Sequence, residues 1–159
     1  MDNMMTHYME LLALNQPWNL ILFMAVPVIL AETIAITELA LLYTRNLSGG
    51  LKKLNKAASI IVGLYFTGVF VYLLFNAVIP ITINGEWRGF ADVVAVGFYL
   101  SGIVPLLGLA LLDLNIIGRK RNELGKLKLH ATFVGIFLVV AHIAMIFGML
   151  DPSLFMMDM

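Results

Sequence analysis

The chain has 159 residues, of which 61% are hydrophobic and only 13% are charged, and its mean hydropathy is +0.94. Soluble domains are usually about half apolar and about a quarter charged, so a water-facing globular enzyme is excluded. The formal net charge is zero and cysteine is absent, which excludes a basic surface for nucleic acid, disulfides and thiolate metal sites. The composition predicts an integral membrane protein with one transmembrane domain over residues 1–159, in contact with the lipid bilayer.

Four apolar stretches are long enough to cross a bilayer, whose hydrocarbon core of about 30 Å needs roughly 20 helical residues. In chain order they cover residues 17–43, 57–81, 90–117 and 129–150. Before the first span, residues 6–15 carry an apolar stripe and are expected to form a short amphipathic segment on the outer membrane surface. Pro27, Pro80 and Pro105 fall inside the spans, where each can interrupt the helical hydrogen bonds.

Positive charges give the expected orientation. Of the ten Lys and Arg residues, four lie between the first two spans and five between the last two, which leaves only Arg88 on the other side. By the positive-inside rule these two loops are cytoplasmic, so both termini are expected on the extracytoplasmic side. Short loops make successive helices antiparallel neighbours, and the predicted fold is an all-α, up-down-up-down bundle of four transmembrane helices. The expected location is the cytoplasmic (inner) membrane of a prokaryote.

Polar side chains inside the spans are expensive, so each is a candidate functional group. With a rise of about 1.5 Å per residue, Glu32 falls near the bilayer midplane and His142 lies about 4 Å outward of it. Tyr72 and Tyr99 fall at about the same outward depth, and Asn76 lies about 10 Å outward. Every span therefore contributes a polar group to one layer on the outer side of the midplane.

Glu32 is the expected functional carboxyl, because an ionised carboxylate at the bilayer centre is costly and binding a proton or a cation removes that cost. Glu38 lies about 10 Å cytoplasmic of the centre, and a functional role and a simple hydrogen bond in the bundle are both open for it. Asp92 and Asp113 lie close to opposite interfaces, where solvated or salt-bridged carboxylates are expected. His130 falls at the cytoplasmic interface and is expected to be solvated.

His142 is a candidate ligand for a metal or a haem, since neutral imidazole binds zinc, copper and iron. Met145 shares its helix face, and His7 can fold over the outer mouth of the bundle, so both are candidate additional metal ligands. Ten methionines are present, most of them towards the two termini. Thioethers suit Cu(I) and haem iron, but methionine also fills gaps in packing.

Three functions are compatible with these residues. The first is a small redox or electron-transfer subunit with a b-type haem or a quinone in the outer half of the bilayer, bound by His142, Tyr72, Tyr99 and Asn76. Four-helix cytochrome b proteins are similar in size and helix count, but they commonly use several intramembrane histidines. The second is a proton- or metal-ion permease with Glu32 as its catalytic carboxylate. The third is a non-catalytic accessory subunit of a membrane complex. A homo-oligomer or a place in a larger membrane complex is expected.

Overall fold

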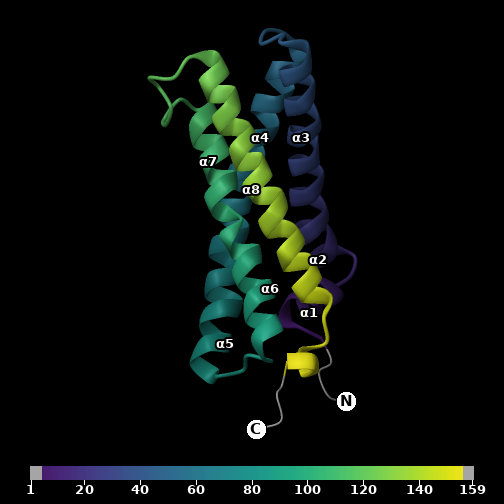
Figure 1. Cartoon of the computed structure of the whole chain (residues 1–159). Coiled ribbons are helices and arrows are strands. Elements are labelled where there is room, and N and C mark those ends of the chain that lie inside the picture. The colour runs from purple at the N-terminus through teal and green to yellow at the C-terminus, as the bar shows by residue number, and fades with distance from the viewer. Residues whose placement is uncertain (1–4, 156–159) are drawn as a thin grey trace. The chain divides into compact units, whose positions relative to one another are not determined.

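The computed structural model describes residues 5–155, and every regular element in this range is helical (Figure 1). Four of the described helical stretches are long and apolar enough to cross a membrane, as the sequence predicts. They are Trp18–Thr44, Gly50–Asn84, Phe90–Asp113 and Glu123–Met149. The methionines at positions 1, 4, 156, 157 and 159 lie outside the described residues.

The first three membrane-crossing stretches are divided into shorter elements, whereas the fourth is one continuous helix. The helices are α1 (His7–Ala13), α2 (Trp18–Leu20), α3 (Val26–Thr44), α4 (Gly50–Leu73), α5 (Ile79–Asn84), α6 (Phe90–Ser101), α7 (Ile103–Asp113) and α8 (Glu123–Met149). Two π-helical turns, η1 (Ile21–Ala25) and η2 (Leu74–Val78), precede α3 and α5, and a 3-10 helix, η3 (Pro152–Phe155), follows α8.

Three boundaries differ from the sequence prediction by four residues or more, and one of them is the start of the fourth stretch, at Glu123 rather than residue 129. The second stretch begins at Gly50 rather than residue 57, so three lysines expected in a loop (Lys52, Lys53 and Lys56) lie in the first turns of α4. The third stretch ends at Asp113 rather than residue 117. Asn115 and Gly118 follow it with φ values of 57° and 70°, and such left-handed residues cannot continue a right-handed helix. Hydropathy alone does not predict where these helices begin and end, because it depends on composition and not on backbone geometry.

Proline accounts for the irregular turns. Pro27 lies just after η1, and Pro80 just after η2. A proline has no N–H, so the carbonyl four residues earlier loses its helical donor, and a π turn is one way in which a helix absorbs this defect. For Pro27 that carbonyl belongs to Phe23, and the Tyr99 hydroxyl donates to it at 2.5 Å. A side chain of α6 therefore replaces the backbone donor that the proline removes.

The described residues form two compact units, and each is described separately. Unit 1 contains residues 5–25, 69–102 and 139–155. In it, α1 packs through Tyr8 and Leu12, which are only 5% and 3% exposed. The Thr6 side chain accepts from the Met9 N–H at the start of α1 and donates to the Gly148 carbonyl of α8 at 2.7 Å. The amphipathic pattern of the N-terminal segment thus serves to pack α1 within its own unit.

Unit 2 contains residues 26–68 and 103–138, which are α3, α7 and the first parts of α4 and α8. Its largest fully buried apolar side chains, each at most 1% exposed, are Ile34, Leu41, Val62, Phe66, Leu106 and Leu109. Helices α4 and α7 approach closely at Gly63, where an added Cβ would lie 2.5 Å from the Cβ of Ala110. Such small-residue contacts are a usual way to pack helices in a membrane.

Candidate functional site

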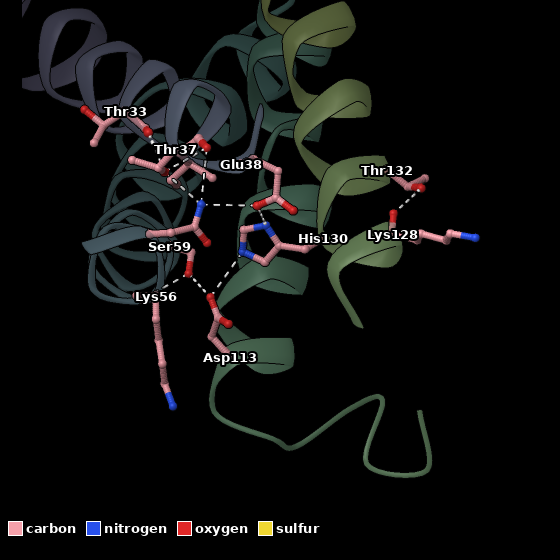
Figure 2. Close-up of polar contacts among 11 residues, drawn as sticks. Thr33, Thr37, Glu38, Lys56, Ser59, Asp113, Lys128, His130 and Thr132 are labelled. Carbon is pink, nitrogen blue, oxygen red and sulfur yellow. Dashed lines mark hydrogen bonds and ion pairs between the residues drawn. The ribbon is translucent and has the colours of Figure 1, made fainter. Parts of the chain in front are cut away.

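A buried histidine lies between two carboxylates in unit 2, as Figure 2 shows. His130 of α8 is 2% exposed, and its Nδ1 lies 2.5 Å from Oε2 of Glu38 on α3. Its Nε2 lies 3.2 Å from Oδ2 of Asp113 on α7. The side chains of Glu38 and Asp113 are 4% and 10% exposed. Three helices therefore each contribute one titratable group to a single buried triad, Glu38–His130–Asp113.

Helix α4 supplies one hydrogen-bond donor to each carboxylate of the triad. The Nδ2 of Asn55 lies 3.1 Å from Oε2 of Glu38 and 2.8 Å from the Thr37 hydroxyl. Ser59, four residues later and hence on the same face of the helix, donates to Oδ2 of Asp113. Asn55 and Ser59 are both fully buried. The spacing of these two donors holds both carboxylates in place on either side of the imidazole.

At the Glu38 end of the triad, some hydrogen-bonding atoms have no partner. Oε1 of Glu38, Oδ1 of Asn55 and Nδ1 of His130 are buried and make no hydrogen bond among the described residues, so the 2.5 Å approach of Nδ1 to Glu38 is an ion-pair contact. A buried acceptor without a donor is unfavourable, and a proton added to the Glu38 carboxyl would reduce the charge buried there. With His130 protonated and both carboxylates ionised, the triad carries a net charge of −1. One further proton would make it neutral, which a low-dielectric interior favours.

The Asp113 end of the triad meets a polar cavity of about 170 Å³. The cavity is lined by Lys52, Lys56, Leu112, Asp113, Asn115, Glu123, Lys126 and His130. Its lining includes two members of the triad and leaves out Glu38. The groups therefore follow in the order cavity, Asp113 and His130, then Glu38, with charged side chains of α4, α7 and α8 facing the entrance.

This order suits the transfer of a proton. An imidazole has two nitrogens, so it can take up a proton at one of them and release another from the opposite side. Here each nitrogen faces its own carboxylate, and the polar cavity adjoins only the Asp113 side. A proton that enters at Nε2 and leaves from Nδ1 would pass from the cavity side to Glu38.

The triad does not stand out in the sequence. The prediction that His130 is solvated at the interface is wrong, because the structure buries that residue between Glu38 of α3 and Asp113 of α7. The expectation for Asp113, a solvated or salt-bridged carboxylate, is met by an ion pair with His130. The available signal was depth, because Glu38, Asp113 and His130 fall towards the cytoplasmic ends of their predicted spans, and Asn55 lies two residues before the second span. Comparing residues across spans at that depth would have grouped them.

The residues expected to form an outer polar layer have mixed positions. Glu32 is exposed on α3, without a hydrogen bond or ion pair to any residue in the described range. On α8, His142 is exposed and Met145 is half-buried. Across residues 5–155, no group of three or more His, Asp or Glu side chains is arranged to hold a metal ion. The roles expected for Glu32, His142 and Met145 stay predictions.

Three of the expected residues do come together in unit 1. His7, Asn76 and Tyr99 line one cavity of about 380 Å³ beside α1, α5 and α6. Tyr72 stays outside that lining, and its ring stacks on Phe23 with the ring centroids 6.0 Å apart. Unit 1 therefore contains a candidate ligand pocket that includes part of the predicted set.

Comparison with known proteins yields a family and no functional relative. No curated protein and no solved structure matches the chain. One family does match, over residues 3–159, and this range includes the triad, both cavities and all four membrane-crossing stretches. Since the match covers nearly the whole sequence, the chain belongs to the family of unknown function DUF6803.

Proposed function

We propose that the protein is a proton permease, in which the buried triad Glu38–His130–Asp113 takes up and passes on protons. The observation that carries the proposal is a single buried imidazole with a carboxylate at each nitrogen. Ionisable groups inside membrane-crossing helices are expensive and commonly form proton relays.

The lysines that line the cavity support a cytoplasmic location for the cavity end of the proton path. In the up-down-up-down arrangement, the positive-inside rule assigns the loops beside Lys52, Lys56 and Lys126 to the cytoplasm. The polar cavity would then connect Asp113 and His130 with cytoplasmic water. Protons would enter or leave the triad on this side, and Glu38 would be the group deepest in the membrane.

Each transfer conserves protons and charge in a simple way. Neutral His130 accepts a proton at the nitrogen facing the cavity and becomes an imidazolium. It then releases the proton on Nδ1 to the Glu38 carboxylate, which becomes a neutral carboxyl. The cycle is complete when Glu38 releases this proton on the side away from His130 and the imidazole regains the tautomer with its hydrogen on Nδ1.

Proton flux into liposomes containing the purified full-length protein tests the proposal. Glu38→Gln removes the deepest proton acceptor while keeping the shape of the side chain, so flux should fall by at least about tenfold, as for loss of a general acid–base group. Asp113→Asn and His130→Gln should have a similar effect. The matched control is Glu32→Gln, the same substitution on the same helix at an exposed position outside the triad.

The control also separates this mechanism from the one expected from the sequence. Loss of flux in Glu38→Gln with normal flux in Glu32→Gln would support the triad. The opposite pattern would exclude the triad and assign the proton to Glu32. Equal flux in all variants would exclude proton transfer through either group. Helix content by circular dichroism must be unchanged in each variant that is compared.

A further inference from the structure

The Asp92 carboxylate of α6 fixes the orientation of His7 in unit 1. Asp92 is fully buried, and its carboxylate accepts hydrogen bonds from two backbone N–H groups, that of His7 at 2.6 Å and that of Arg88 at 3.2 Å. Its Oδ2 also lies 2.6 Å from Nδ1 of His7. Since a carboxylate accepts, the Nδ1 of neutral His7 carries the hydrogen, and Nε2 is left as an acceptor. Nε2 has no hydrogen-bond partner in the part of the chain that the structure describes.

His7 lines the cavity of about 380 Å³, a volume within the usual range for small-molecule pockets. Much of the wall is apolar, with Leu73, Val78, Ile81, Val96 and Leu100 among the lining residues. Polar side chains also line it, from Glu10, Asn76, Glu86, Arg88 and Tyr99. The combination fits an amphipathic molecule with an apolar body and a small polar group.

The cationic side chain of this cavity is already engaged by the protein. Arg88 donates to the Met5 carbonyl at 2.7 Å and also pairs with the Glu10 carboxylate. Because Arg88 and Glu10 neutralise each other, the cavity has no free cation to attract an acidic ligand. A neutral ligand is therefore favoured over an anion.

Other donors around the cavity are also in use. The Tyr99 hydroxyl donates to the Phe23 carbonyl, and Nδ2 of Asn76 donates to the Tyr72 carbonyl at 2.8 Å. In the neutral imidazole the open position at Nε2 of His7 is an acceptor, so a ligand that binds this form must donate a hydrogen bond. Burial raises the pKa of Tyr8, which also lines the cavity, to about 12, so its hydroxyl stays neutral near pH 7.

We propose that this cavity binds a neutral, membrane-soluble phenol or hydroquinone whose hydroxyl donates to Nε2 of His7. The aromatic ring and any alkyl tail lie against the apolar wall, as burial of apolar surface favours. A hydroxyl both donates and accepts, so the same group can also receive a hydrogen bond from Tyr8. The site is separate from the proton triad, and it does not depend on proton transfer.

Binding of decylhydroquinone to the full-length protein in nanodiscs tests this site. Trp87 is a suitable reporter, because its ring centroid lies 6.4 Å from that of His7. Trp18→Phe removes the other tryptophan of the chain and leaves Trp87 as the single fluorophore. Decylhydroquinone, kept reduced, should quench Trp87 in a saturable way. Its dimethyl ether, which cannot donate a hydrogen bond, should bind at least about tenfold more weakly. Nanodiscs without protein give the background.

A matched variant separates the acceptor from the packing of α1. His7→Asn keeps a donor near the position of Nδ1, and with it the contact to Asp92, but removes the acceptor at Nε2. The Kd for decylhydroquinone should rise by about tenfold or more, while that for the dimethyl ether should stay the same. Tyr43→Phe, an exposed position in unit 2, should change neither value.

Three results would overturn the proposal: no saturable quenching, equal affinity for the hydroquinone and its dimethyl ether, or an unchanged Kd in a folded His7→Asn variant. The ligand comparison uses the chain with His7 intact, so it decides the question even if the variant fails to fold.

Discussion

The hydroxyl of Tyr99 offers a sharp test of how this chain compensates for a proline in a membrane-crossing helix. Pro27 cannot donate to the carbonyl of Phe23, and Tyr99 donates to that carbonyl from α6 at 2.5 Å. Phe23 is buried, with 8% of its surface exposed. Tyr99→Phe keeps the ring and leaves the carbonyl without this donor. Loss of a buried hydrogen-bond partner costs about 1–3 kcal/mol, so the free energy of unfolding should fall by about that amount.

A double-mutant cycle isolates the proposed compensation. Pro27→Ala restores a backbone N–H four residues after Phe23, so the carbonyl regains a donor within its own helix. In that background Tyr99→Phe should cost less than about 0.5 kcal/mol, which makes the coupling energy between the two positions about 1 kcal/mol. The free energies are measured by reversible denaturant titration of the purified protein in detergent micelles.

The coupling, and not the cost of the single variant, decides this prediction. Tyr99→Phe could destabilise the protein through its ring contacts as well, but such a loss would be the same in both backgrounds. Equal costs with proline and with alanine at position 27 would refute the idea that Tyr99 replaces the missing backbone donor.

Three further predictions follow from packing and from the redox expectation. Gly63→Ala should lower the free energy of unfolding by about 1–3 kcal/mol, because its Cβ would lie 2.5 Å from that of Ala110. Gly68→Ala, in the same helix with open space around it, should be neutral or stabilising by up to about 1 kcal/mol, and a loss like that of Gly63→Ala would contradict the packing argument. Gly148→Ala should release α1, because its Cβ would overlap the ring of Tyr8, and limited proteolysis should then cleave the N-terminal segment faster. If the chain binds a b-type haem through His142, the protein purified from haem-supplemented cells should show a Soret band. A spectrum without that band would exclude haem binding.

The sequence predicts the number and approximate limits of the apolar helices, because those depend on hydropathy summed over about 20 residues. It does not predict where α7 ends, since that depends on Asn115 and Gly118 adopting left-handed backbone angles. Nor does it predict that α1 packs within unit 1 through Tyr8 and Leu12, because an amphipathic segment has the same pattern on a membrane surface as against other helices.

The candidate site depends on contacts that no single helix encodes. The depth estimate grouped the outer polar residues, and the structure brings Asn76 and Tyr99 to one cavity with His7. Taken alone, a histidine beside Lys128 at the end of a span indicates a solvated side chain, and this is why the sequence predicts a solvated His130. Its burial follows from the simultaneous presence of Glu38 and Asp113, one at each ring nitrogen. A polar residue near a span end should therefore be judged with the polar residues at the same depth in the other spans.

The contrast between Glu32 and Glu38 illustrates the same point within one helix. The two are six residues apart, so an α-helix turns their side chains about 120° away from each other. When one of them faces its neighbouring helices, the other must face elsewhere. Depth favoured Glu32, which lies nearer the predicted midplane. The structure instead turns Glu38 towards Asn55 and His130, where a carboxylate has both a donor and a proton partner. The availability of partners, more than depth, is thus the reason for proposing Glu38 as the carboxyl of this helix that exchanges a proton.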